Sequence, residues 1–122
     1  MSKKILIADD EQNIVISIDF LLRREGFAVL IANDGEEALA KVRDEQPDLV
    51  LLDVMMPKMN GFDVCQAVRA DPDLSATRIL MLTAKGRDTE VSKGLGLGAD
   101  GYMTKPFSTK ELLAEVRKLL EM

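Results

Sequence analysis

The sequence predicts one α/β domain, a doubly wound parallel sheet of five strands with helices on both faces. Three observations lead to this fold class. The 122 residues have the size of a single domain. Short apolar runs alternate with stretches of helical periodicity, which favours parallel strands joined by right-handed crossovers. The central run, residues 49–52, is apolar throughout, as in a strand buried on both faces. We therefore expect a single domain over residues 1–122.

The strands are predicted from compact apolar or β-branched runs that are bounded by charged, glycine or proline residues. In chain order the predicted strands are residues 4–8, 27–32, 49–52, 79–82 and 100–104. Each run is short enough for a strand and too short for an independent helix, which supports five strands in one sheet.

Two helices are predicted between the first three strands. Apolar residues recur at i, i+4, i+7 and i+8 from Ile14, and Gly26 is a C-terminal stop, so we expect a helix over about 12–25. A shorter helix passes through Val42 and ends before Pro47, because the residue before a proline disfavours helical backbone.

The central strand is followed by a loop and a third helix. Residues 54–61 contain Pro57 and end in the turn signal Asn60-Gly61, so they are predicted to form a loop over the sheet edge. Asn60 is also a suitable N-cap for a third helix, which residues 71–72 (Asp-Pro) close.

The last two helices differ in their signals. A fourth helix is expected over about 88–97, where Gly94 and Gly96 lower its intrinsic stability and make it a candidate for movement. The fifth begins at a capping box in which Ser108 and Glu111 stand three positions apart.

Composition excludes several classes of function. A net charge of −5 disfavours broad contact with nucleic acid or anionic lipid, so we expect neither partner. Cys65 is the only cysteine and there is no histidine, which argues against a disulfide within the chain, zinc sites and imidazole catalysis. The longest apolar run, 27–32, is too short to cross a bilayer. With no signal peptide either, we expect a cytoplasmic protein.

Residues able to do chemistry stand where the predicted strands end. In a parallel sheet of this kind, sites form outside the carboxyl ends of the strands. The residues at those ends are Asp9, Asp10, Asp53, Thr83 and Lys105. Three carboxylates close together resist ionisation unless a cation joins them, and an all-oxygen set favours Mg²⁺. With the metal bound, Asp53 could act as a nucleophile towards phosphorus, forming an aspartyl phosphate.

These motifs resemble the receiver domains of two-component response regulators. The motifs are Asp-Asp after the first strand, Asp53 with Met-Met-Pro-Lys-Met-Asn-Gly at 55–61, Thr-Ala at 83–84, and GADGYMTKPF at 98–107. Their order and spacing match the family over essentially the whole chain. The resemblance implies a flavodoxin-like sheet with strand order 2-1-3-4-5.

The resemblance also implies a role for each residue of the site. Asp53 would be the phosphoacceptor, Lys105 would contact the phosphoryl group through a cis Lys105-Pro106 bond, and Thr83 and Tyr102 would be switch residues. The implied Mg²⁺ ligands are Asp10, Asp53 and the backbone carbonyl of Met55, with Asp9 holding a metal-bound water.

The predicted function is therefore a phosphorylation-activated signalling switch that catalyses only its own phosphorylation and dephosphorylation. The donor would be a sensor histidine kinase or a histidine phosphotransfer protein. The phosphorylated domain would control a protein partner through the face of the fourth helix, fifth strand and fifth helix. We expect a monomer before phosphorylation. Four positions on that face favour a stand-alone regulator, because they lack the charged residues expected of a dimerising transcription factor: Val91, Leu97, Gly101 and Glu115.

Two alternatives remain open. A small aspartyl-phosphate phosphatase uses similar groups, but it would want a second carboxylate at the position of Met55. A phosphorylation-independent interaction module on the same fold is disfavoured by the complete acidic set. A nucleotide-binding enzyme would need a glycine-rich first turn, whereas residues 9–11 are all acidic.

Overall fold

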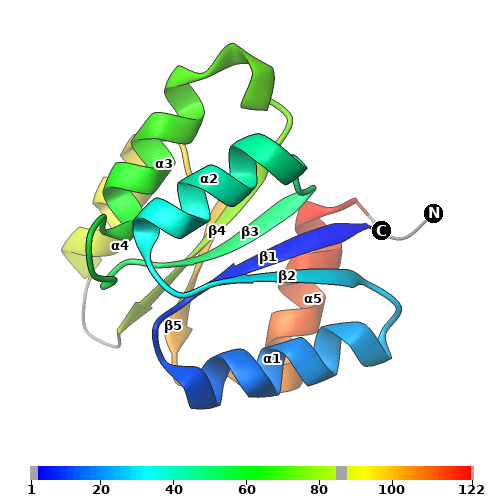
Figure 1. Cartoon of the computed structure of the whole chain (residues 1–122). Helices are drawn as coiled ribbons and strands as arrows, with labels where there is room; N and C mark the ends of the chain where they lie inside the picture. The colour runs from blue at the N-terminus through cyan, green and yellow to red at the C-terminus, as the bar shows by residue number, and fades with distance from the viewer. Residues whose placement is uncertain (1–2, 85–87, 122) are drawn as a thin grey trace.

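The computed structural model describes residues 3–84 and 88–121, and in it five parallel strands form one sheet (Figure 1). The order across the sheet is β2-β1-β3-β4-β5, as the family resemblance implied. The strands are β1 (Lys4–Ala8), β2 (Ala28–Ala32), β3 (Leu49–Asp53), β4 (Arg78–Ala84) and β5 (Gly101–Lys105).

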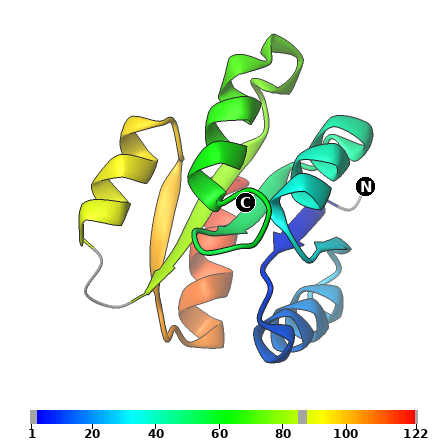
Figure 2. The ribbon, with the colours of Figure 1, turned by 60° about the vertical axis from the view of Figure 1, so that its left-hand side comes forward.

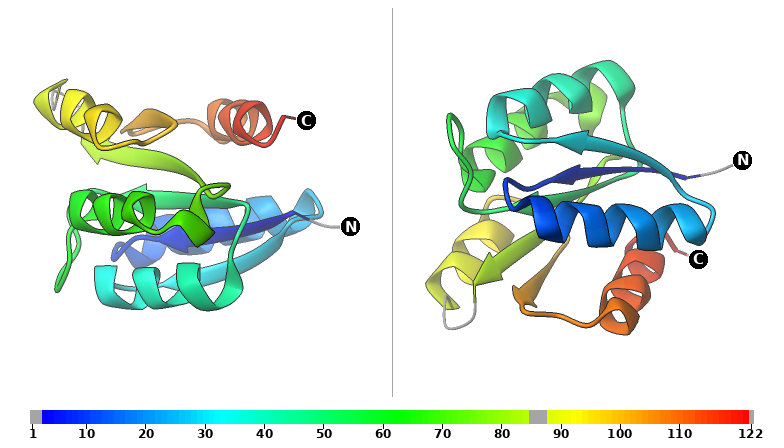
Figure 3. Two further views of the ribbon diagram at one scale, coloured as in Figure 1. Left: turned by 90° about the horizontal axis from the view of Figure 1, so that it is seen from above. Right: turned by 60° about the horizontal axis from the view of Figure 1, so that its bottom comes forward.

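Five α-helices cover the two faces of this sheet, with α1 and α2 on opposite sides in the right-hand view of Figure 3. Apolar residues of α1 and α5 pack together on one face, and those of α2 and α3 pack on the other. The helices are α1 (Gln12–Arg24), α2 (Gly35–Glu45), α3 (Gly61–Ala70), α4 (Asp88–Gly96) and α5 (Thr109–Leu119). None of the helices within the described residues is both long and apolar enough to cross a bilayer.

The central strand β3 is buried along its whole length, from Leu49 to Asp53. It lies between β1 and β4, so neighbouring strands satisfy its backbone while helices cover both of its faces. This confirms the interpretation of the continuous apolar run. The strand ends at the carboxyl edge of the sheet. Asp53 lies there, buried but within reach of a ligand at that edge.

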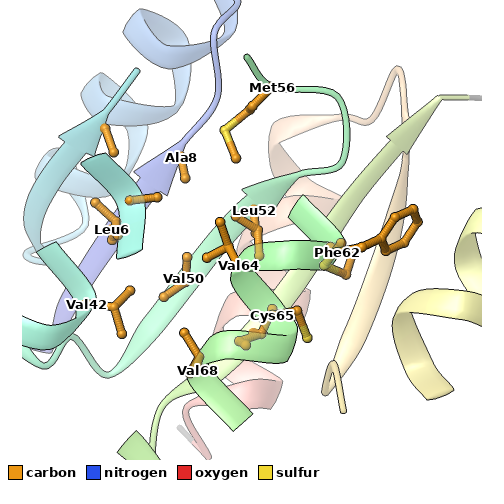
Figure 4. Packing of buried hydrophobic residues seen from close by; sticks show 14 of the residues in the cluster. Leu6, Ala8, Val42, Val50, Leu52, Met56, Phe62, Val64, Cys65 and Val68 are labelled. Atoms are coloured by element: carbon orange, nitrogen blue, oxygen red, sulfur yellow. The ribbon is translucent and has the colours of Figure 1, made fainter. Parts of the chain in front are cut away.

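Apolar residues of α3 belong to one buried cluster with residues of β1 and β3 (Figure 4). Within that cluster, Cys65 is completely buried, and its Sγ lies 3.7 Å from the backbone oxygen of Leu97. Burial is the main cause that raises the pKa of the Cys65 thiol. Cys65 is therefore a packing residue of the core.

Strand β5 forms one edge of the sheet, and α4 packs beside it (Figure 2). Each residue of β5 is exposed or half-buried. Tyr102 is 47% exposed on this strand. This edge is therefore the part of the sheet at which a partner protein could recognise a conformational change in β5.

The caps predicted from sequence are present. The Asn60 side chain accepts a hydrogen bond from the Asp63 backbone N–H, at 2.9 Å. Ser108 and Glu111 form the reciprocal capping box that starts α5. These short polar motifs fix where two helices begin, and therefore where the loops leading to them must run.

Several element boundaries differ from the sequence prediction. Strand β4 extends to Arg78–Ala84, beyond the predicted 79–82, because its neighbours on both sides continue its pairing. Strand β2 begins at Ala28 rather than at Phe27, whose ring is buried in the core. A short 3-10 helix at Pro72–Leu74 was not predicted.

Candidate functional site

Three carboxylates meet at the carboxyl edge of the sheet. Strands β1 and β3 are neighbours, with Ala8 paired to Leu52, so the residues that follow them lie side by side. One oxygen each of Asp9, Asp10 and Asp53 lies within 4.8 Å of the others. Asp9 and Asp53 are buried, whereas Asp10 is exposed. The site is therefore held on two sides by the core and is open to solvent through Asp10.

Lys105 supplies the positive charge of this site from the end of β5. Its Nζ donates to Asp9 Oδ2 at 3.0 Å and to Glu11 Oε1 at 2.9 Å, and it lies 3.4 Å from Asp53 Oδ1. Burial alone would lower the pKa of Lys105, but the hydrogen bonds to Glu11 and Asp9 and the charges of Asp53 and Asp9 raise it instead. The ammonium group is therefore charged at neutral pH.

The carboxyl group of Asp53 has an unusual acidity. Burial and the neighbouring charge of Asp9 raise its pKa to about 6, although Lys105 and a hydrogen bond from the Met55 backbone N–H act in the opposite direction. Without a cation, the site therefore resists the ionised form of the very group that would act as nucleophile. This agrees with the repulsion inferred from the sequence.

The donor set fits a hard divalent cation. The clustered ligand atoms are all carboxylate oxygens, and Mg²⁺ prefers oxygen ligands and commonly keeps several waters. Asp10 is exposed, so a cation bound here would remain accessible to water and to a phosphate oxygen. The Met55 side chain is also exposed at the rim, 65% of its surface being accessible.

The first turn of α3 holds the end of β3 in place. The Gly61 backbone N–H donates to the Val54 oxygen at 2.9 Å, and the Val54 N–H donates to the Leu82 oxygen at 3.2 Å. A Cβ added at Gly61 would lie only 2.4 Å from the backbone oxygen of Asp53. Glycine at this position therefore permits the close approach that fixes Asp53.

The two switch candidates occupy different environments. Thr83 is buried, and its hydroxyl is directed at the Met103 backbone oxygen at 3.5 Å. Tyr102, in contrast, is 47% exposed on the edge strand. Thr83 pairs in register with Thr104, two positions beyond Tyr102, so the two candidates lie on adjacent strands.

The positions named from the sequence on the face of α4, β5 and α5 lack most of the charges expected of a dimerising transcription factor. Leu97 is half-buried and Glu115 lies 3.9 Å from Lys118 Nζ on its own helix. Gly101 has no side chain, and the side chain of Val91 lies outside the described residues. Leu95 adds an exposed apolar group to this face, 44% of its surface being accessible.

Sequence reasoning missed Glu11 as a part of the site. Its carboxylate contacts Lys105, and its backbone N–H donates to Asp9 Oδ1 at 2.9 Å. The signal was available, because Glu11 directly follows the acidic pair at the end of a strand. An acidic residue at the start of a helix has a common structural explanation, however, and only the position of Lys105 reveals the contact.

Comparison with known families accounts for this arrangement. The model of the response regulator receiver domain matches residues 5–117. The chain belongs to this family. The peptide bond between Lys105 and Pro106 is cis, as the resemblance implied for a receiver domain.

Curated relatives of this receiver domain include a transcriptional regulatory protein and a DNA-binding response regulator. The chain is 50% identical over 120 residues to the alkaline phosphatase synthesis transcriptional regulatory protein PhoP of Bacillus subtilis, covering 98% of this chain and 49% of PhoP. It is 48% identical to the DNA-binding response regulator MtrA of Mycolicibacterium smegmatis, covering 98% of this chain and 51% of MtrA. This receiver domain therefore spans about half the length of these relatives.

Solved structures share the fold over the whole receiver domain. A response-regulator structure from Chloroflexus aurantiacus superposes with a TM-score of 0.95 at 34% identity, covering 100% of both chains. The chemotaxis response regulator CheY4 of Vibrio cholerae gives a TM-score of 0.92 at 35% identity, covering 98% of this chain and 99% of that one.

Proposed function

We propose that this receiver domain is a phosphorylation-activated switch in which Asp53 accepts a phosphoryl group in a Mg²⁺-dependent reaction. The donor is a phosphohistidine on a sensor histidine kinase or on a histidine phosphotransfer protein. The domain catalyses only its own phosphorylation and dephosphorylation, so it is not an enzyme with a separate substrate. It works in the cytoplasm and is a monomer before phosphorylation.

The observation that carries this proposal is the surroundings of the Asp53 carboxylate. It is buried at the end of a rigid central strand, 3.4 Å from the Lys105 ammonium and beside the oxygens of Asp9 and Asp10. Phosphoryl transfer needs positioning and neutralisation of charge more than covalent assistance. A fixed carboxylate nucleophile beside a fixed cation meets both needs.

The transfer forms one bond and breaks one. A carboxylate oxygen of Asp53 attacks the phosphorus, and a new O–P bond forms while the P–N bond to the donor imidazole breaks. The electron pair of that bond remains on the imidazole nitrogen. Lys105 donates to a phosphoryl oxygen, and the buried Thr83 hydroxyl is available to a second one. Asp10, Asp53 and the Met55 carbonyl would hold Mg²⁺, with Asp9 acting through water, and the bound cation would neutralise phosphoryl charge.

The output of the switch is a protein partner at the face of α4, β5 and α5. This face contains a groove of about 910 Å³ whose lining includes Leu95, Tyr102 and Glu115. A partner that recognises the position of the Tyr102 ring would distinguish the two states of the domain. We propose no direct contact of the domain with nucleic acid, consistent with its net charge of −5.

The identity with PhoP and MtrA favours one particular use of this switch. Those relatives are named as a transcriptional regulatory protein and a DNA-binding response regulator, and each is about twice as long as this chain. A receiver domain of this sequence within a longer regulator would control transcription through its partner domain. The stand-alone regulator expected from the sequence is the competing arrangement of the same phosphorylation chemistry.

Intact mass after incubation with acetyl phosphate tests the proposal. We expect one added phosphoryl group in the parent protein with Mg²⁺, and none in Asp53→Asn or in the parent with EDTA. Hydroxylamine should remove the group, because it cleaves an acyl phosphate. An unmodified parent that also fails to bind Mg²⁺ would contradict the proposal and favour an interaction module that works without phosphorylation.

A different result would favour a phosphatase. Continuous release of phosphate from added phosphoesters, with turnover well beyond one per protein, would indicate an enzyme acting on a separate substrate. Met55 occupies the position where such an enzyme would want its second carboxylate, so we expect no such turnover.

A further inference from the structure

The Lys105 ammonium donates hydrogen bonds to two carboxylates, and neither of them belongs to Asp53. An ammonium carries three N–H groups. In this structure Nζ lies 3.0 Å from Asp9, 2.9 Å from Glu11 and 3.4 Å from Asp53, each through one carboxylate oxygen. A phosphoryl group on Asp53 requires at least one of these donors. The donor that faces Asp53 can serve one phosphoryl oxygen, so a second hydrogen bond from Lys105 to the phosphoryl group requires Asp9 or Glu11 to release the ammonium.

Two of the three carboxylates are not free to leave. The Asp9 side chain is fully buried, and its second oxygen accepts the Glu11 backbone N–H at 2.9 Å. Asp53 is buried at the end of β3 and carries the incoming group itself. Moving either of them would leave a carboxylate in the interior without its partners, which is costly.

Glu11 can leave at little cost. Its side chain is 57% exposed, compared with 15% for Lys105. Both residues line an open groove of about 650 Å³ between α1 and the connection from β5 to α5. When Glu11 releases Lys105, its side chain can rotate into the solvent. Its charge is then solvated by water, and no buried group is left unpaired.

We infer that Glu11 is a positioning residue that holds Lys105 in the unphosphorylated domain and competes with the phosphoryl group for its ammonium. The inference rests on the proposed function, since the competitor is the phosphoryl group on Asp53. Glu11 thereby sets how strongly the phosphorylated state is favoured. Loss of the contact to Lys105 should make the site bind a phosphoryl mimic more tightly.

The test uses beryllofluoride, a mimic of the phosphoryl group, with Mg²⁺ and three variants. Glu11→Ala removes the contact and the charge. Glu11→Asp keeps the charge but is one methylene shorter, and an aspartate at an N-cap binds backbone N–H groups of the first helical turn, so it is drawn away from Lys105. Glu36→Ala is the matched control: Glu11 is the exposed N-cap residue of α1, and Glu36 is an exposed acidic residue in the first turn of α2.

We expect both Glu11 variants to bind beryllofluoride about three-fold more tightly than the parent. A change of this size in binding free energy is typical of the loss of one exposed ion pair. Glu36→Ala should match the parent. If Glu11→Ala binds more tightly but Glu11→Asp matches the parent, only the charge of Glu11 matters and the inferred competition is overturned. If all three variants match the parent, the inference fails while the proposed function stands. A parent protein that binds neither beryllofluoride nor acetyl-phosphate-derived phosphate would instead contradict the proposed function.

A measurement without metal or mimic checks the contact itself. The Lys105 ammonium signals in NMR spectra of the metal-free protein should shift in Glu11→Ala and Glu11→Asp and remain unchanged in Glu36→Ala. Unchanged Lys105 signals in both Glu11 variants would show that the ion pair is not formed in solution, and would overturn the inference independently of any binding result.

Discussion

At the scale of single residues, the carboxylate of Asp53 carries an energetic cost that its neighbours offset only in part. Its pKa is raised to about 6 by burial and by the charge of Asp9, despite the nearby Lys105. A carboxyl group with a raised pKa destabilises the folded state wherever it must ionise. The cost is therefore absent below the unfolded value of 3.8, grows up to about pH 6 and is constant above that.

Asp53→Asn should accordingly stabilise the metal-free protein. With solvent screening allowed for, we expect a gain of about 1 kcal/mol in the free energy of unfolding at pH 8. Urea unfolding in EDTA between pH 4 and pH 8 measures it. The gain should shrink as the pH falls from about 6 towards 4, and a gain that is independent of pH would contradict the assigned cause. Saturating Mg²⁺ should stabilise the parent more than the variant.

Individual site residues were predictable to different degrees. Asp9, Asp10, Asp53 and Lys105 follow from a general rule, since the carboxyl ends of parallel strands meet at one edge. That rule places a residue at the edge but does not say where a long side chain turns. The contact between Glu11 and Lys105, and the exposed position of Tyr102, depend on side-chain direction and therefore required the structure.

At the scale of elements, the packing of α3 against the end of β3 depends on the absence of a side chain. A Cβ at Gly61 would lie 2.4 Å from the Asp53 oxygen and 3.0 Å from the Val54 Cα, and both are backbone atoms that have no flexible side chain to yield. We expect Gly61→Ala to reduce the free energy of unfolding by about 1–3 kcal/mol, the usual range for overpacking. It should also slow phosphorylation by acetyl phosphate, because Asp53 is displaced.

Gly96→Ala is the control for that variant. Nothing lies within 4 Å of a Cβ added at Gly96, which is the last residue of α4. An alanine there should leave phosphorylation unchanged and should be neutral or slightly stabilising, since alanine is the better helix former. Equal effects of the two substitutions on stability and phosphorylation would show that the close approach at Gly61 is not what matters.

The elements themselves were largely readable from the sequence, and the errors have a common cause. Type and order came from periodicity and caps, which are local properties of the chain. The extent of β4 depends on its two neighbours in the sheet, which local patterns do not report. The 3-10 helix at Pro72–Leu74 is a single turn capped by Asp71, too short to produce a periodic signal.

At the scale of the whole molecule, the proposed switch has to connect a buried site with an exposed edge. Thr83 is buried on β4, and Tyr102 is 47% exposed on the neighbouring β5. A phosphoryl group brings roughly two negative charges and three acceptor oxygens, so it should attract the Thr83 hydroxyl. The space that this movement leaves would admit the Tyr102 ring. We therefore expect the ring to become less accessible when the site is occupied.

Intrinsic fluorescence can follow this movement without a label. Tyr102 is the only tyrosine and the chain has no tryptophan. Beryllofluoride with Mg²⁺ should reduce the quenching of this fluorescence by acrylamide, and Thr83→Ala should weaken the effect while still binding the mimic. Quenching that stays the same in the parent at saturating beryllofluoride would refute the coupling between the two residues.

The single thiol of the protein offers a further use. Cys65 is completely buried and burial raises its pKa, so it stays protonated and shielded, whereas maleimides react with accessible thiolates. A cysteine introduced at an exposed position such as Met55 would consequently be the one labelled under native conditions, with no need to remove the natural cysteine. The rate of any slow labelling of Cys65 itself would report how often α3 separates from the turn at Leu97. It would therefore measure the rate of local opening of the domain.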